Sequence, residues 1–549
     1  MEEKTKKNVK YNILAIVLLI IFSISITPVE LQNDTFYTIK IGEHLLETGK
    51  IDMVDPFSWH ENLVYTYPHW LYDIFIYLIY SVGGMTGVYI STCVFSAILG
   101  LSIYFVNTKL NKNHLVSFMV TMGAMYILRP YIAARAQLIT FILFLWTIYG
   151  IEKFLETKKK RYAVMLAIIP IIIANVHSAV WPFYFVLYMP YIGEYLVTIF
   201  IDIFNFGINT EKRINKKIEK LRKTGKPNAE KEILKLEESL KNYKEKVEKI
   251  KQRKANKEPY KVIIEKNKNV KWLIVLMLIF ILTGFLTPIG DIPFTYYLRT
   301  SQGNTMEHIS EHLPLTLAEH IDVISMILIY LAILIFTDCK MTLRDLFMLG
   351  GLVFLMFMTR RQVSMMALIT CIILNRLITY VFEKHDKGGI ERFENMMVKV
   401  PGMLITICFV VVLSSYFIEP KLDDEFVSKS SYPVDACDYI LENLDVKNMK
   451  IYNDYNYGSY LLYRGIPVYV DSRCDLYTPE FNEGVDIFTE YIDISGLNAD
   501  YTFKFEEHGI THVMVYANSK LSSAIEKRTD TKYNRIYSDS YFELYEINM

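Results

Sequence analysis

The sequence has 549 residues, of which 52% are hydrophobic and 14% aromatic, and its formal net charge is zero. Its mean hydropathy is +0.21 and its apolar residues gather in long runs, which excludes an ordinary soluble protein and indicates a polytopic membrane protein. No Walker motif, GxGxxG or GxSxG sequence occurs, which argues against ATP use, a dinucleotide cofactor and a serine hydrolase.

Long apolar runs predict a mainly helical fold, in which a bundle of about eleven membrane spans occupies residues 1–418. The predicted spans are 12–29, 86–107, 114–129, 136–153, 162–176, 179–204, 271–287, 319–337, 344–359, 362–382 and 399–418. The first run follows a basic stretch but lacks a small-residue cleavage site, so we interpret it as an uncleaved helix.

The segment 70–83 is apolar but short, and its treatment decides the orientation of the chain. If it crosses the membrane, the basic sequence 153–161 and the basic loop 211–271 fall outside, against the excess of Lys and Arg in cytoplasmic loops. If it lies in the outer interface, all basic loops fall on one side. We therefore expect a cell-membrane protein with a cytoplasmic N-terminus, a first outer loop at 30–69 and an extracytoplasmic C-terminal domain.

Residues 205–270 are rich in Lys and Glu, and they carry apolar residues at helical spacing on both sides of TGKPN (224–228). This pattern predicts an antiparallel helical hairpin on the cytoplasmic side. The hairpin is either a solvated structural insertion or a surface that binds anionic lipid or a partner.

Residues 419–549 have a different composition, with short strands that alternate with helices. Strands are predicted at 449–453, 467–471, 511–516, 533–538 and 541–546, and helices at 434–444, 456–464, 480–490, 499–508 and 518–526. This alternation predicts a small α/β domain with a mainly parallel sheet. Cys437 and Cys474 share this domain, and an oxidising exterior would permit a disulfide between them.

The first outer loop places two carboxylates next to the membrane. Asp34 follows the first span, and Asp55 opens a DPFS turn. A partly desolvated carboxylate has a raised pKa and can deprotonate an acceptor hydroxyl or bind a metal ion. Alternatively, Asp34 caps a helix over 36–48 and Asp55 only begins a turn. We expect this helix to lie along the outer interface, with its apolar side formed by Ile39, Ile41, Leu45 and Leu46.

Basic side chains lie at the predicted outer ends of other spans. Arg135 and the pair Arg360 and Arg361 can bind a phosphate through paired hydrogen bonds, although anchoring at the lipid interface explains them equally well. His177 follows a long apolar run and is either a substrate contact or a structural group.

The sequence TMEHISEHLP (305–314) contains E-H-x-x-E-H, which is similar in composition to a metal site. On a helix, Glu307 and Glu311 would share a face, as would His308 and His312. The order differs from the H-E-x-x-H of metalloproteases, so peptide hydrolysis is not indicated.

Taken in order, these segments resemble the motifs of the GT-C superfamily of bacterial and archaeal membrane glycosyltransferases. The first-loop signature, in which an Asp and two aromatic residues precede D-P-F-S, is similar to DTFYTIKIGEHLLETGKIDMVDPFS (34–58). Further motifs of the family are similar to ARAQLIT (134–140), ANVHS (174–178), LTPIG (286–290), ISEHLP (309–314), TRRQVSMMAL (359–368) and the segment 452–477. Their consistent order is more specific than any single match.

Enzymes of this superfamily transfer a sugar from a polyprenyl-phosphate carrier to an acceptor on the outer side of the membrane. The resemblance implies that Asp34 is a general base or metal-associated carboxylate, with Asp55 as the second acid. It also implies that the donor phosphate and sugar contact Arg135, His177, Glu311, Arg360 and Arg361. A divalent metal, Mg²⁺ or Mn²⁺, would be held by Asp34, Asp55 and Glu311. The expected partners are the lipid-linked sugar donor, a cell-surface glycan, lipid or protein acceptor, and the bilayer, without nucleic acid.

The sequence departs from the family pattern at three positions. Thr38 stands where a His is usual, Ser178 where a Gly is usual, and His312 where a Trp is usual. Because of these three departures, the resemblance does not determine the metal requirement or the identity of the sugar. Arg473 and Asp475 either help to recognise an acceptor or are internal ion-pair and turn residues.

Two other functions are open to a polytopic chain. A transporter or flippase of lipid-linked glycans would carry ionisable residues at mid-membrane and repeated halves, whereas these spans are nearly free of charge at their centres and show no internal repeat. A non-catalytic scaffold or sensor would bind a ligand through the C-terminal domain and signal through the hairpin.

Overall fold

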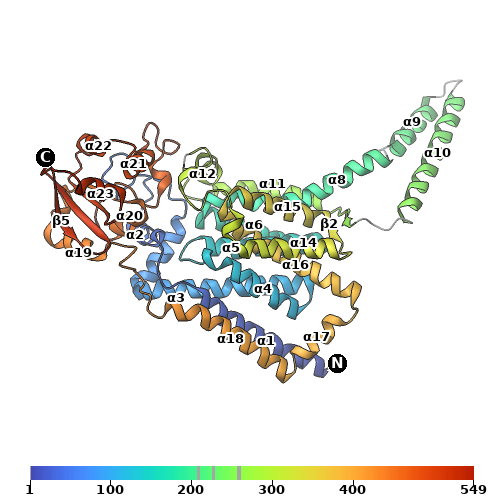
Figure 1. The fold of residues 1–549 in the computed structure, drawn as a ribbon. Coiled ribbons are helices and arrows are strands. Elements are labelled where there is room, and N and C mark those ends of the chain that lie inside the picture. The colour runs from blue at the N-terminus through green and yellow to red at the C-terminus, as the bar shows by residue number, and fades with distance from the viewer. Residues whose placement is uncertain (1, 207–209, 225–228, 256–260, 304, 549) are drawn as a thin grey trace.

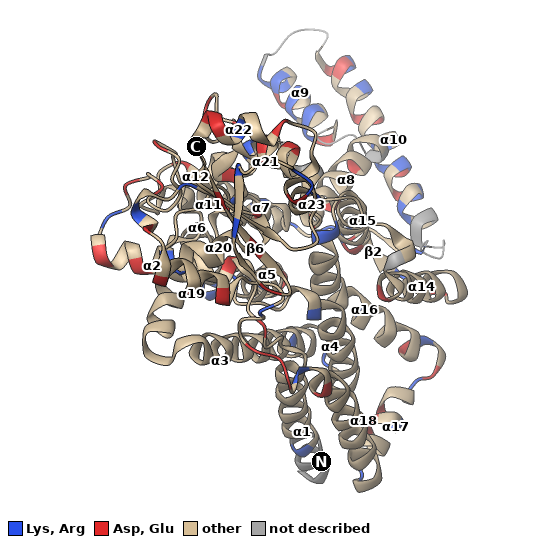
Figure 2. Ribbon diagram, turned by 60° about the vertical axis from the view of Figure 1, so that its left-hand side comes forward, with Lys and Arg blue, Asp and Glu red and all other residues tan. Residues whose placement is uncertain are grey.

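The computed structural model describes residues 2–206, 210–224, 229–255, 261–303 and 305–548. A bundle of long helices carries the C-terminal α/β domain at one end, and the N-terminus and the hairpin of α9 and α10 lie at the other end (Figure 1). Charged residues, coloured blue and red on the ribbon, are frequent along the hairpin and the C-terminal domain, and the long helices carry few of them (Figure 2). The two ends of the molecule are therefore polar and the middle is apolar.

The bundle consists of helices that bury apolar faces against one another. They are α1 (Glu2–Ile26), α3 (Trp70–Asn111), α4 (His114–Leu128), α5 (Gln137–Thr157), α6 (Lys160–Val176), α7 (Trp181–Val186), α8 (Met189–Phe206), α11 (Val270–Phe280), α12 (Ile292–Thr300), α14 (Ile321–Phe336), α15 (Leu343–Met358), α16 (Val363–His385), α17 (Gly389–Met397) and α18 (Val400–Ile418).

Among the described residues, five helical stretches are long and apolar enough to cross a membrane, namely Trp70–Asn111, Gln137–Thr157, Ser178–Phe204, Arg360–His385 and Val400–Lys421. Shorter apolar helices occupy Lys10–Ile26, Val270–Phe285 and Ile321–Phe336. Helices occupy every predicted span, but the number of eleven crossings and the orientation of the chain stay predictions.

The segment 70–83 forms the first part of α3, a continuous element of 42 residues. Gly84 interrupts the helical geometry with φ 58° and ψ −153°, a conformation that a residue with a Cβ rarely adopts, and α3 kinks there. The kink falls where the sequence separates 70–83 from the span 86–107. The location of the first part in the outer interface stays a prediction.

The helix of the first outer loop, α2 (Asn33–Thr48), packs against α3 and against α20 of the C-terminal domain. It approaches α3 closely at Gly42, where an added Cβ would lie 2.1 Å from the carbonyl oxygen of Asp73. Three of the four apolar residues expected on one side of α2 are buried, whereas Leu46 is exposed. Protein therefore covers much of this helix, which holds its first turn in place.

Two charged helices, α9 (Thr210–Thr224) and α10 (Ala229–Ala255), lie within the predicted insertion. They run side by side and project from the bundle (Figure 1). Arg222 pairs with Glu237 at 3.0 Å and Lys244 with Glu211 at 3.2 Å across the two helices. Near the base of this helical hairpin, β1 (Val262–Ile263) pairs in parallel with β2 (Met341–Thr342).

The C-terminal domain contains α19 (Val434–Asn443), β3 (Ile451–Tyr452), α20 (Tyr455–Tyr463), α21 (Ile487–Gly496), α22 (Tyr501–His508), β4 (His512–Tyr516), α23 (Lys520–Glu526), β5 (Tyr533–Ser538) and β6 (Phe542–Ile547). The strand order is β3-β4-β6-β5, and only the β3–β4 pair is parallel. The prediction of a mainly parallel sheet is therefore wrong. The Asp539 carboxylate accepts bonds from the N–H groups of Tyr541 and Phe542 at 2.7 and 2.8 Å, and this short turn makes β5 and β6 antiparallel.

Two further expectations for this domain are wrong. The segment 467–471 forms only an isolated bridge between Val468 and Ser58 in place of a strand, and the helix expected over 480–490 begins at Ile487. The sequence leaves a disulfide between Cys437 and Cys474 open, and in the structure both are buried free cysteines. Burial raises the pKa of the Cys437 thiol to about 12, which makes it an unreactive core residue.

Candidate active site

Three charged residues meet where the helical bundle adjoins the C-terminal domain. Asp34 lies in the first turn of α2, whose cap position is taken by Gln32, so the expectation that Asp34 caps this helix is wrong. Arg135 lies just before α5, and Glu311 follows α13 (Thr305–His308). The Arg135 guanidinium donates one terminal nitrogen to Asp34 (Nη2–Oδ2 2.9 Å) and the other to Glu311 (Nη1–Oε1 3.3 Å). Residues far apart in the sequence thus form one cluster.

Pairing keeps Arg135 and Glu311 charged in spite of burial. Burial would lower the pKa of the Arg135 guanidinium, but the carboxylates of Asp34 and Glu311 raise it above its ordinary value. Burial would likewise raise the pKa of Glu311, and the charges of Arg135 and Arg361 lower it. The side chains of Arg135, Asp34 and Glu311 remain 25, 23 and 47% exposed, so a substrate can reach all three.

The two arginines of TRRQ have different surroundings. Arg360 directs Nε to the carbonyl oxygen of Pro314 (3.4 Å). The N–H of Arg361 donates to the Glu311 carbonyl oxygen (3.1 Å), which ties this turn to the cluster. Within the described parts of the chain, the Arg361 guanidinium has no hydrogen-bond or ion-pair partner. Arg361 is therefore the better placed of the two to bind an anion.

His177 ends α6 and is buried beside the cluster. Its Nδ1 lies 3.0 Å from the Thr140 hydroxyl oxygen. Burial, and then the charge of Arg361, lowers the pKa of the imidazole well below its ordinary value, so this side chain is neutral. Ser178 donates its N–H to the carbonyl oxygen of Pro68 (2.8 Å), which holds the end of α6 against the residues that precede α3.

A second polar group beside the cluster was not predicted from the sequence. The Tyr37 hydroxyl lies 3.2 Å from His69 Nε2, and His69 Nδ1 lies 2.8 Å from the buried carboxylate of Asp73. Burial would lower the pKa of His69, but Asp73 raises it above its ordinary value. Tyr37 is one turn from Asp34 on α2. The available signal was the spacing of His69 and Asp73, which places them on one face of a helical turn.

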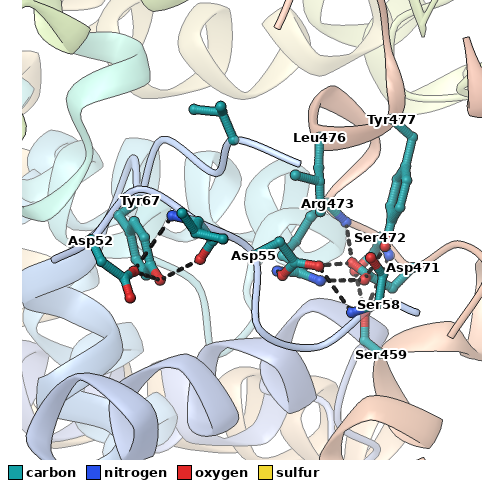
Figure 3. A network of polar contacts seen from close by, with 12 residues as sticks. Asp52, Asp55, Ser58, Tyr67, Ser459, Asp471, Ser472, Arg473, Leu476 and Tyr477 are labelled. Carbon is teal, nitrogen blue, oxygen red and sulfur yellow. Dashed lines mark hydrogen bonds and ion pairs between the residues drawn. The ribbon is translucent and has the colours of Figure 1, made fainter. Parts of the chain in front are cut away.

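Asp55 lies in a different place from the cluster, in a buried network that Figure 3 shows. Arg473 donates to Asp55 (Nη1–Oδ1 2.5 Å) and to Asp471 (Nη2–Oδ2 2.6 Å), and the Ser58 N–H binds the second Asp55 oxygen (2.9 Å). The Asp55 side chain is 0% exposed. Burial would raise its pKa, but the charge and hydrogen bond of Arg473 lower it. Both oxygens are occupied, so Asp55 is not placed to act with Asp34 or to hold a metal beside it.

The C-terminal domain also reaches the cluster directly. Asn33, next to Asp34, donates from Nδ2 to the carbonyl oxygen of Tyr455 (2.9 Å). The Tyr296 hydroxyl of α12 donates to the Asp475 carboxylate. Burial raises the pKa of Asp475, against the opposite effects of this hydrogen bond and of Arg361. Of the two residues considered for acceptor recognition, Arg473 is an internal ion-pair residue, and Asp475 faces the bundle.

Of the three residues expected to hold a metal, Asp34 and Glu311 come together around Arg135, whereas Asp55 lies elsewhere. Helix α13 ends at His308, so the E-H-x-x-E-H sequence does not place its i, i+4 pairs on one helix face. Among the described residues, one set of three ligand-type side chains lies close together, Glu490, Glu507 and His508 of the C-terminal domain, and Lys504 binds both of its carboxylates. Asp34 and Glu311 instead bind the Arg135 guanidinium. The predicted set of Asp34, Asp55 and Glu311 does not fit a divalent cation.

No protein-family model matches this sequence, and no curated protein matches it. Solved structures of the archaeal oligosaccharyltransferase AglB from Archaeoglobus fulgidus are similar to it. The complex of AglB with an inhibitory peptide and a dolichol-phosphate matches with a TM-score of 0.51 and 11% identity, over 92% of this chain and 69% of that one. The apo form matches with a TM-score of 0.54 and 10% identity over the same shares. The form tethered to an acceptor peptide matches with a TM-score of 0.51 and 10% identity, over 98% of this chain and 74% of that one.

At this identity the likeness establishes the fold, and it agrees with the resemblance of the sequence motifs. Together with the long apolar helices, it identifies a membrane protein. The chain therefore has the GT-C fold, the fold of the membrane glycosyltransferase AglB.

Proposed function

We propose that this chain is a membrane glycosyltransferase that transfers a sugar from polyprenyl phosphate to an acceptor at the outer face of the membrane. The cluster of Asp34, Arg135 and Glu311 carries the proposal, because it places two carboxylates and a guanidinium where an apolar bundle meets a polar domain. A lipid-linked phosphate sugar has its reacting bond at such a boundary. The AglB complex with a dolichol-phosphate supports a donor of this class.

In the proposed reaction, the nucleophilic oxygen or nitrogen of the acceptor attacks the anomeric carbon of the sugar. The bond from that carbon to the phosphate oxygen breaks, and polyprenyl phosphate leaves with its electron pair. The proton of the nucleophile passes to the Asp34 carboxylate as general base. Arg135 binds Oδ2 of this carboxylate, which leaves Oδ1 to accept the proton.

Guanidinium groups are suited to the charge that develops on the departing phosphate. We assign the donor phosphate to Arg361, because its guanidinium lacks an internal partner among the described residues. Arg135 supports the same assignment, since its Nε is buried and has no partner within the described residues. Arg360 is directed to Pro314 and would shape the loop. His177, buried against Thr140, would position the end of α6 beside the sugar.

The buried charges of the bundle do not favour a transporter. Arg376 binds Glu152 (3.0 Å) and Asp345 (2.7 Å), and Arg344 lies 3.9 Å from Glu152, so these carboxylates are held in ion pairs. Glu152 lies about 25 Å from Arg135 along α5, at 1.5 Å per residue, and is therefore remote from the cluster. A transport pathway would need ionisable groups that are free to bind and release a substrate or a proton.

The test compares lipid-linked sugars and surface glycans in cells that carry the intact chain, a deletion, Asp34→Asn or Glu47→Gln. Glu47 is an exposed residue of the same helix and serves as the matched control. We expect the deletion and Asp34→Asn to lose a glycan and accumulate its lipid-linked donor, and Glu47→Gln to behave like the intact chain. Identical profiles in the intact chain and the deletion would refute the proposal.

A further inference from the structure

We propose that the Arg135 guanidinium occupies the position between the two site carboxylates that a divalent cation would need, so that this site works without a bound metal. The inference rests on the proposed function, because it names the group that supplies positive charge at the same site. It replaces the expectation that Asp34, Asp55 and Glu311 hold Mg²⁺ or Mn²⁺.

The geometry of the cluster is that of an ion-pair bridge. The two terminal nitrogens of Arg135 lie 2.9 Å from Asp34 and 3.3 Å from Glu311. An oxygen ligand lies about 2.1 Å from Mg²⁺, so a cation that joined these carboxylates would have to lie in the space of the planar guanidinium. The backbone of Arg135 is fixed as well, since its N–H donates to the Ala133 carbonyl oxygen at 2.8 Å immediately before α5.

Among the described residues, the surroundings of the cluster bring no third His, Cys, Asp or Glu ligand to Asp34 and Glu311. Within the parts of the chain that the structure describes, Asp34 and Glu311 belong to no set of three His, Cys, Asp or Glu side chains whose ligand atoms lie within 4.8 Å of one another. Asp55 is bound on both oxygens by Arg473 and Ser58. A cation joined to two carboxylates alone would lack the ligands that a dedicated protein site provides.

The charges at the site are already balanced. Asp34 and Glu311 are matched by Arg135 and by Arg361, whose charge contributes to the lowered pKa of Glu311 after the effects of burial and Arg135. A divalent cation would lie beside two guanidinium groups and would be repelled by both. Arg135→Gln should therefore create a cation site, because it frees both carboxylates, leaves them with a single positive neighbour and adds the amide oxygen of the glutamine as a third ligand.

The experiment measures Mn²⁺ binding by electron paramagnetic resonance on the purified full chain in detergent. The variants are Asp34→Asn, Arg135→Gln, Arg135→Gln combined with Asp34→Asn, and the control Arg129→Gln, which removes a partly exposed arginine from the neighbouring turn. The group of Glu490, Glu507 and His508 contributes the same background to every sample.

We expect equal Mn²⁺ binding by the intact chain, Asp34→Asn and Arg129→Gln. We expect Arg135→Gln to gain a site at least about tenfold tighter than the background, and the double variant to lose it. A site in the intact chain that disappears in Asp34→Asn would overturn the proposal, and this comparison does not depend on the folding of any arginine variant. A folded Arg135→Gln protein, monodisperse by size exclusion, that gains no site would also overturn it.

This test is independent of the substrate. Unchanged glycans in the deletion would refute the proposed function while leaving the Mn²⁺ result to be judged separately. An Asp34-dependent metal site, together with loss of the glycan in Asp34→Asn cells, would refute only the present inference. In membranes, sugar transfer by the intact chain should persist in EDTA, which provides a second readout.

Discussion

Replacing Asp55 with asparagine should loosen the first outer loop from the C-terminal domain. The Asp55 and Arg473 side chains are 0 and 2% exposed, so their ion pair is fully buried. Removing one partner of such a pair costs about 3–5 kcal/mol. Asparagine keeps a hydrogen-bond acceptor, and Arg473 keeps its ion pair with Asp471. We therefore expect a cost at the lower end of this range, about 3 kcal/mol. This cost is roughly a hundredfold in the equilibrium constant for opening the loop away from the C-terminal domain.

Hydrogen exchange at the amides of this loop measures that opening. The N–H of Ser58 binds Asp55 Oδ2, and the N–H of Trp59 binds the Val468 carbonyl oxygen at 3.3 Å. Both should exchange roughly a hundredfold faster in Asp55→Asn, whereas Asp52→Asn, at an exposed position of the same loop, should leave them nearly unchanged. Exchange within about threefold of the intact chain would refute the inference that this pair holds the loop.

The site arginines, the ion pair of Arg376 and the Asp55 carboxylate each have a measurable effect. Arg361→Gln should weaken binding of polyprenyl phosphate by about tenfold or more, since a hydrogen bond to a charged group contributes about 1.5–3 kcal/mol. Competition binding on the solubilised chain measures this change. Arg360→Gln should have a much smaller effect, and equal effects of the two variants would contradict the assignment of the donor phosphate to Arg361. Arg376→Met leaves the partly buried Glu152 without that partner and should destabilise the bundle by about 1.5–3 kcal/mol, which an unchanged thermal midpoint would contradict. Burial would raise the pKa of Asp55, but Arg473 lowers it in the folded chain. The stabilisation from this carboxylate is therefore fully present above an ordinary carboxyl pKa of about 3.9, and it is lost as the pH falls through the lower folded value. Hydrogen exchange at the Asp55 loop, corrected for its intrinsic rate, should rise with acidification below about pH 4, and Asp55→Asn should abolish this dependence.

The helices were predictable because their signals are local. The span predicted at 114–129 agrees with α4 (His114–Leu128), where the Asn113 side chain accepts the Val116 N–H at 2.8 Å and Pro130 follows the end. The order of the family-like motifs likewise indicated that Asp34, Arg135 and Glu311 belong to one site, although no local pattern joins them.

The contacts that the sequence did not reveal are those between distant segments. Asp55 and Arg473 are 418 residues apart, and each lies in a motif with a plausible local role, so their pairing was not visible. The antiparallel pairing in the sheet arises because β6 lies between β4 and β5. The alternation of strands and helices along the sequence does not determine which strands pair. The expected metal-ligand set likewise placed Asp55 beside Asp34, whereas Asp55 pairs with the distant Arg473.

The rate at which sugar leaves the lipid carrier measures the proposed reaction itself. Cells expressing equal amounts of the intact chain, Asp34→Asn or Glu47→Gln would receive a pulse of labelled sugar, and the label would be followed from the polyprenyl-phosphate pool into surface glycans. The label should leave the lipid pool in the intact chain and in Glu47→Gln, and it should leave about a hundredfold or more slowly in Asp34→Asn, as expected for loss of a general base. Equal rates of label transfer in the intact chain and Asp34→Asn would contradict the account.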